Sequence, residues 1–377
     1  MMITFIFNVV SMALQAYEKY AFIHLVTLTS GIITPIINVI VLKSGGRSVA
    51  VSVISLIVSL MCYIIYFFYA RKAIRLEFAF RGFDKDVMKE IFIFSGFLFL
   101  NSITDQITFS TDNIVLSTVK GTTAVAIYSV GTNFKYYFQQ FAAGISGVFG
   151  PVIHMNVAQG KDIKNLDDIF IRVGRIQFYV VSLILIGYVF IGQDFVRLWA
   201  GDGYQDAYYI GLMLMISVFI PSIQGVGLEI QKAFNMHKAR SLVYFGIALI
   251  NVVITIPLSK IWSGLGAAFA TMICMVAGAA VFMNIYYWKK IGLNIPCFFK
   301  SMVSILPGYI LPISVGLLIN LFLDINGYSE ILLAVVLIVF SFIFSIWFCS
   351  MNDYEKELVK KPLRKIYYRV TKNQQSK

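Results

Sequence analysis

The stretch of sequence that decides the fold is IFIFSGFLFLNSITDQITFSTDNIVLS, residues 91–117, an apolar run with polar residues at regular intervals. Steps of four, three and four separate its polar residues Asn101, Asp105, Thr108 and Asp112. Such steps place side chains on one face of an α-helix. We therefore predict a helix over 91–117 that carries one polar stripe on an otherwise apolar surface.

A second apolar segment, residues 123–151, carries a matching stripe. The same steps separate its polar residues Tyr128, Thr132, Lys135 and Gln139. If both helices cross a membrane, each charged side chain costs roughly 2.5–3.5 kcal/mol. Such residues persist where they face a water-filled cavity or one another, so the two stripes are the first candidate for a functional site. For the uncharged residues the alternative is hydrogen bonding between helices, which contributes about 0.6–2 kcal/mol each.

The composition indicates an all-α polytopic membrane protein. Of the 377 residues, 59% are apolar and 13% are charged, and the mean hydropathy is +0.79. A soluble domain has about 25% charged residues. We expect about eleven transmembrane helices, within residues 1–16, 21–42, 48–70, 91–117, 123–151, 169–196, 205–228, 241–261, 264–287, 301–323 and 330–350.

The distribution of Lys and Arg predicts the orientation in the membrane. Connections after the odd-numbered segments, with the C-terminal tail, hold most of them, so the net charge of +12 does not indicate nucleic-acid binding. Basic loops stay in the cytoplasm. We therefore expect a multi-pass membrane protein with a cytoplasmic C-terminus. The first segment then begins outside the cell, which predicts missing spans before it and a truncated N-terminus.

A weak internal repeat relates residues 14–72 to residues 230–290. Gln15 matches Gln231, and Asn38 matches Asn251. Two copies in the same direction are typical of transporters built from two lobes, with the substrate path between them. The predicted domains are the second half of an incomplete first six-helix lobe (1–75), a complete second lobe (88–290), an appended helix pair (298–350) and a basic cytoplasmic tail (351–377).

Depth along the helices suggests pairs of charged residues. Asp105 and Lys135 both lie about 18–20 Å from the outer surface, at 1.5 Å per residue, and are a predicted ion pair. Asp112 lies two turns farther out, where it is a candidate proton or Na⁺ ligand. Near the cytoplasmic side, Arg172 and Arg175 either reach lipid headgroups or bind a phosphate of a lipid-linked substrate. The scattered Cys and His residues predict no disulfide, no metal site and no catalytic residue.

Several short motifs resemble a known family. The pattern Ser102-x-x-Asp105-Gln106, followed by Asp112-x-x-Val115 and Gly121-x-x-x-Val125-Ala126-x-Tyr128-Ser129, resembles the middle of bacterial polysaccharide flippases. These are the O-antigen (Wzx-type) transporters of the multidrug/oligosaccharidyl-lipid/polysaccharide exporter (MOP) superfamily, whose two-lobe fold is shared with the multidrug (MATE) exporters. Leu14-Gln15-Ala16-x-Glu18-Lys19 and residues 264–268 (GLGAA) are similar to it too. Family members have further spans before the first one seen here.

The resemblance implies that an undecaprenyl-diphosphate-linked oligosaccharide is moved from the inner to the outer leaflet by alternating access, for lipopolysaccharide O-antigen or capsule. It implies substrate binding by Lys135, Arg172, Arg175 and Gln139. Ion coupling or charge balance would come from Asp105, Asp112 and Asn101. No cofactor is expected, and coupling to H⁺ or Na⁺ stays open. The expected partners are the lipid-linked oligosaccharide, membrane lipids and the polysaccharide polymerase machinery.

Three alternatives are weighed against this interpretation. A drug/cation antiporter of the same fold would need acidic residues mainly in the first lobe. A membrane enzyme, such as a polymerase or an acyltransferase, would need a large external loop or clustered His, Arg and Asp. A non-functional fragment is the third alternative. We expect a transporter rather than an enzyme.

Overall fold

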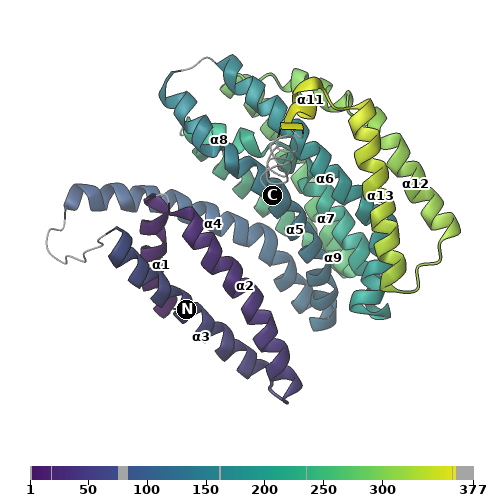
Figure 1. Cartoon of the computed structure of the whole chain (residues 1–377), viewed down its shortest axis with the longest axis horizontal. Helices are drawn as coiled ribbons and strands as arrows, with labels where there is room; N and C mark the ends of the chain where they lie inside the picture. Colours follow the sequence, from purple (N-terminus) through teal and green to yellow (C-terminus); the bar gives the residue numbers. More distant parts are fainter. Residues whose placement is uncertain are drawn as a thin grey trace, which may run out of the picture. The chain divides into compact units, whose positions relative to one another are not determined.

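The computed structural model describes residues 2–17, 19–74, 84–160, 163–234, 236–358 and 360–361. Within these ranges the regular secondary structure is entirely helical (Figure 1). The chain divides into two compact units, Met1–Ile91 and Phe92–Lys377. The predicted lobes and the appended helix pair stay predictions, and most of the basic tail, residues 362–377, lies outside the described residues.

The first unit contains three helices, α1 (Met2–Ala16), α2 (Tyr20–Lys43) and α3 (Ser48–Ala73). Leu14, Val26 and Tyr66 bury their side chains where the three helices meet. The ring of Phe22 stacks on that of Tyr69, with centroids 3.6 Å apart. The remaining surface is strongly apolar, as expected for helices surrounded by lipid.

The second unit holds the rest of α4 and the helices that follow it. α4 spans Lys85–Lys120, so it begins in the first unit and ends in the second. The α-helices after it are α5 (Thr122–Ala158), α6 (Ile163–Ala200), α7 (Gln205–Ile223), α8 (Gly225–Ala233), α9 (His237–Met275), α10 (Met283–Tyr286), α11 (Ile295–Val303), α12 (Ile310–Phe322) and α13 (Tyr328–Cys349). Short turns of other helical types, η1 (Asp202–Tyr204), η2 (Val276–Phe282), η3 (Tyr287–Ile291) and η4 (Leu306–Tyr309), connect some of them.

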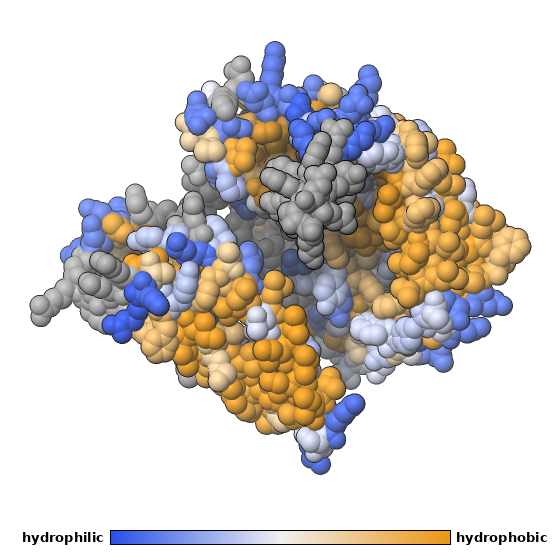
Figure 2. Space-filling model, in the orientation of Figure 1, coloured by the Kyte–Doolittle hydropathy of each residue, from blue (hydrophilic) through white to orange (hydrophobic). Residues whose placement is uncertain are grey.

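Eight described segments are long and apolar enough to cross a membrane: Tyr20–Lys43, Val49–Ala73, Thr122–Ala158, Ile163–Ala200, Asp202–Ile223, Arg240–Ile291, Ile295–Phe322 and Tyr328–Cys349. The prediction of an all-α polytopic membrane protein is therefore confirmed. Figure 2 shows a broad apolar surface over α12 and α13, with polar residues gathered at its ends.

Eight segments satisfy these criteria where about eleven were predicted, and the differences have simple causes. α1 has only 15 residues, which is shorter than a span. α4, which carries the polar stripe, is not among the eight. The predicted segments 241–261 and 264–287 are counted together as Arg240–Ile291.

The Arg240–Ile291 segment is two helices rather than one. Its backbone leaves helical geometry at Trp262 and Ser263, where Ser263 has a φ of +53°. In a straight helix Asn251 and Thr271 would lie about 30 Å apart. Their side chains are instead joined by a hydrogen bond of 3.2 Å, so the chain turns back at this break, as the two predicted segments require.

α5 and α7 approach closely at Gly131. A Cβ atom at this position would lie 2.7 Å from Cγ2 of Ile210 and 2.9 Å from the carbonyl oxygen of Ala207. Gly144, on the same helix, has open space where its Cβ would be. The glycine at 131 is therefore required by packing, whereas that at 144 is not.

We predict that Gly131→Ala destabilises the protein by about 1–3 kcal/mol, because the added methyl group forces α5 and α7 apart. Gly144→Ala is the matched control and should leave stability unchanged or slightly higher, since alanine is the better helix former. Thermal unfolding of the purified protein in detergent measures both variants. Equal melting temperatures for the two variants would contradict the close approach.

Candidate functional site

The second unit contains a buried carboxyl group, that of Asp112 near the end of α4. Its side chain is only 2% exposed. It accepts hydrogen bonds from the hydroxyl groups of Tyr128 on α5 (2.5 Å) and Thr271 on α9 (2.9 Å). The hydroxyl of Thr255, also on α9 but before its break, lies 3.4 Å from the other carboxyl oxygen. Asp112 therefore holds α4, α5 and both halves of α9 together.

Asn251 completes this network from one turn before Thr255. Its side-chain oxygen lies 3.2 Å from the hydroxyl of Thr255 and 3.4 Å from that of Thr271. Each threonine has a single hydroxyl proton. Each can therefore donate either to Asp112 or to Asn251, so the network has alternative hydrogen-bonding arrangements of similar geometry.

Lys135 provides a positive charge close to this network. It lies two turns after Tyr128 on α5 and is 5% exposed. Its charge and that of Asp112 interact within the unit. Buried charges are expensive unless they are balanced, and more so within a membrane. We call Asp112, Tyr128, Lys135, Asn251, Thr255 and Thr271 the Asp112 cluster.

The cluster lies two turns or more from the nearest ends of α4 and of the two halves of α9. Asp112 precedes the turn at Gly121 by nine residues, and Thr255 precedes the break at Ser263 by eight. Thr271 follows that break by eight residues. At 1.5 Å per residue these positions are about 12–14 Å from the ends of their helices. In a membrane protein, ionisable residues buried among the helices are often functional.

The structure brings together two of the charged residues singled out from the sequence, Asp112 and Lys135. Gln139, one turn beyond Lys135, is half-buried. The side chains of Asn101, Asp105 and Thr108 lie outside the described residues, so the Asp105–Lys135 pair stays a prediction.

Sequence reasoning missed the three residues that α9 contributes to the cluster. The four-residue step from Asn251 to Thr255 was visible, and Asn251 belongs to the internal repeat. Neither residue is charged, however, and Thr271 comes after the break. Only the turn at Ser263 brings it opposite the other two.

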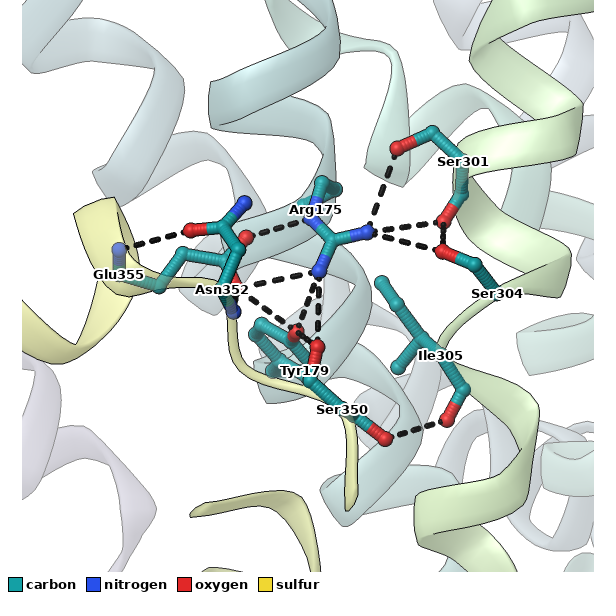
Figure 3. Close-up of polar contacts among 8 residues, drawn as sticks. All are labelled: Arg175, Tyr179, Ser301, Ser304, Ile305, Ser350, Asn352 and Glu355. Carbon is teal, nitrogen blue, oxygen red and sulfur yellow. Dashed lines mark hydrogen bonds and ion pairs between the residues drawn. The ribbon is translucent and has the colours of Figure 1, made fainter. Parts of the chain in front are cut away.

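Arg175 on α6 forms a second buried polar network, which Figure 3 shows. Its guanidinium group is bidentate to the carboxylate of Glu355, which follows α13. It also donates to the carbonyl oxygen of Ser301 (3.0 Å), the hydroxyl of Ser304 (3.1 Å) and the carbonyl oxygen of Ser350 (3.0 Å). Arg175 and Glu355 are 6% and 3% exposed. The pair therefore fastens α6 to α11 and to the end of α13.

The segment after α13 is held by its own contacts as well. The backbone N–H of Asn352 donates to Glu355 (3.0 Å), and the backbone N–H of Glu355 donates to the side chain of Asn352 (2.9 Å). The guanidinium of Arg172 lies over the ring of Tyr354, 4.9 Å from its centroid. Phosphate binding by Arg172 and Arg175 stays a prediction. In the structure, Arg175 directs its donors to the protein itself, whereas Arg172 is exposed.

We predict that Asp112 and Lys135 depend on each other. Asp112→Asn and Lys135→Met should each lower stability, with a coupling of about 0.5–3 kcal/mol between them, because each leaves one buried charge without the opposite charge. The double variant should lose less than the sum of the two. Thermal unfolding in detergent measures this cycle, with Lys120→Met at the exposed end of α4 as control. Additive losses would show that the two charges are independent.

We predict that Glu355→Gln loosens the end of α13, because it leaves Arg175 buried without its counter-charge. The expected loss is about 3–5 kcal/mol, with faster proteolytic cleavage after Cys349. Glu357→Gln is the matched control: its partner Lys361 is 3.3 Å away at the surface, and such pairs contribute about 0–1 kcal/mol. Equal protease resistance of the two variants would argue against a fastening role.

A comparison with protein families identifies one match. A family model described as "Polysaccharide biosynthesis protein" matches residues 1–209, which is more than half of the chain. The match covers α1 to α6 and the start of α7, and so includes Asp112, Tyr128, Lys135 and Arg175. No curated protein and no solved structure matches the chain.

Proposed function

The chain belongs to the polysaccharide biosynthesis protein family, and on this premise we propose that it is a flippase for a lipid-linked oligosaccharide. It would move an undecaprenyl-diphosphate-linked sugar chain across the bacterial inner membrane, for assembly of an O-antigen or a capsule. The observation that carries the proposal is the Asp112 cluster. It places one acidic and one basic side chain in buried positions, within the residues that match the family.

The cluster suggests how transport would be coupled to an ion. While Asp112 is ionised, it balances the charge of Lys135. When Asp112 binds a proton or Na⁺, this balance is lost, and the lysine becomes a ligand for an anionic substrate group. The threonine hydroxyls then turn from Asp112 to Asn251, an acceptor within 3.4 Å of both. Ion binding and phosphate binding thereby favour each other.

Alternating access requires two bodies that move against each other. In this proposal the two predicted lobes, residues 1–75 and 88–290, would be those bodies. Arg172, exposed beside Tyr354, is the better placed of the two arginines to meet a phosphate, since Arg175 is bonded to the protein.

The distribution of Lys and Arg supports an orientation with the C-terminus in the cytoplasm. In this orientation Arg172 lies at the inner leaflet, where a lipid-linked substrate is made. Membrane lipids and the machinery that polymerises the sugar chains are the further proposed partners.

We predict that Lys135→Ala abolishes export of the surface polysaccharide while the protein still inserts into the membrane. The test uses cells that lack their own flippase, and it measures both surface polysaccharide and lipid-linked precursor. The expected result is loss of the polymer with accumulation of the precursor, because the sugar chain is made but not moved. Asp112→Asn combined with Lys135→Met controls for stability: it should fold and still fail to export.

Unchanged export by Lys135→Ala would reject the assignment of this residue. Loss of the precursor itself, rather than its accumulation, would point to an enzyme of the same pathway. A variant at the exposed end of α4, Lys120→Ala, should behave as the wild type in every measurement.

A further inference from the structure

The first unit contains a polar groove that the Asp112 cluster does not use. The described residues that line the groove belong to α1, α2 and α3, and its volume is about 410 Å³. This lies within the range of about 300–1,000 Å³ that is usual for small-molecule sites. The whole groove lies within the residues matched by the family model.

Each helix contributes a stripe of polar side chains at helical spacing. The stripes are Asn8, Ser11 and Gln15 on α1, Thr27, Ser30 and Thr34 on α2, and Ser55 and Ser59 on α3. Steps of three and four residues place each stripe on one face of its helix. Other faces of these helices are apolar and exposed, for example at Leu28, Leu56 and Met61. The unit is therefore apolar where lipid surrounds it and polar along one groove.

Several hydroxyl groups of this groove bond within their own helices rather than between helices. Ser30, Thr34 and Ser59 donate to carbonyl oxygens of their own helices, at 2.9, 2.7 and 2.7 Å. A hydroxyl oxygen that donates in this way still accepts hydrogen bonds. The hydroxyl pair between α2 and α3 in the groove, Thr27 with Tyr66, is 3.3 Å apart. The groove thus presents acceptors, together with the side-chain amides of Asn8 and Gln15.

The chemistry of the lining selects one class of ligand. Among the residues that the structure describes, none that lines the groove is charged. A phosphate would require basic partners, and the described lining offers none. An organic cation could contact the rings of Tyr63 and Tyr66, but no described acidic residue of the lining would balance its charge. Lipid tails cannot form hydrogen bonds with these hydroxyls and amides. Within a membrane, such groups need water, protein or a polar ligand as hydrogen-bond partners. A molecule rich in hydroxyl groups and without charge satisfies all of them.

We propose that the groove of α1, α2 and α3 binds uncharged sugar residues of the oligosaccharide. This inference rests on the proposed function and adds to it the kind of sugar and the place where it is held. The sugar hydroxyls donate to the Ser and Thr oxygens and exchange hydrogen bonds with the amides of Asn8 and Gln15.

The native residue Cys62 gives a direct test, because its thiol lines the groove and is partly exposed. The full-length chain is used with Cys274, Cys297 and Cys349 replaced by Ser. A water-soluble, negatively charged methanethiosulfonate reagent is added to membranes from cells that make the lipid-linked precursor. The same reaction is measured in membranes from cells in which attachment of the first sugar is blocked.

We expect Cys62 to react in both membranes, and about fivefold more slowly where the precursor is present, because a bound sugar chain covers the thiol in proportion to its occupancy. Met61→Cys in a chain with Cys62→Ser is the matched control. Residue 61 is 61% exposed on the apolar side of α3 and should be unreactive in both membranes. An unreactive Cys62, or a rate that the precursor does not change, would overturn the proposal.

A second measurement tests the absence of charge. The precursor that protects Cys62 is extracted and its sugars are identified by mass spectrometry. Neutral sugars are expected, and a repeat unit made of uronic acids would overturn the proposal. Ser30→Ala and Ser59→Ala should each reduce protection about three- to tenfold, the value of one hydrogen bond. Leu56→Ala, on the exposed apolar side, should not.

The two proposals fail in different ways. If Lys135→Ala leaves export unchanged while the precursor still protects Cys62, the chain binds sugar but the transport assignment is rejected. If Lys135→Ala blocks export but the precursor does not change the reaction rate of Cys62, the flippase assignment is retained. The groove then has no role in binding sugar.

Discussion

The interaction on which the second unit depends is the set of hydrogen bonds to Asp112. A carboxyl group inside a membrane is tolerated only if protein groups replace water around it. Here the replacement comes from Tyr128 and from two threonines on either side of a break in α9. The position of Asp112 therefore fixes where α5 lies and how sharply α9 must turn. Packing features such as Gly264, whose Cβ would lie 2.9 Å from Ile210, follow from the same turn.

The two buried networks of this unit differ in the number of hydrogen-bonding arrangements that each allows. Arg175 and Glu355 form a bidentate pair with further carbonyl and hydroxyl partners, so the pair has one good arrangement. The two threonine hydroxyls beside Asp112 each have a second acceptor in Asn251, so they can change partner and keep a hydrogen bond. The first network is suited to holding helices in place, and the second to responding when a charge is gained or lost.

The helices and part of the site followed from sequence spacing, and the rest required tertiary structure. Steps of four, three and four predicted the stripes that carry Asp112, Tyr128 and Lys135, because helical periodicity is a local property. The partners of these residues on α9 are 143 and 159 positions from Asp112, and no local pattern encodes such contacts. Arg175 was predicted to reach lipid headgroups or to bind a phosphate for a similar reason. Its counter-charge, Glu355, is 180 residues farther along the chain, and no local pattern predicts that contact.

That same separation has a consequence for how the protein is made. At about 5–20 residues per second, the ribosome reaches Glu355 roughly 10–40 s after it has synthesised Arg175. During this interval the nascent chain carries a guanidinium group with no counter-charge, which favours the water at the membrane surface over the interior. We therefore expect the burial of Arg175 to follow the synthesis of Glu355, so that the last segment of the chain completes the packing of α6.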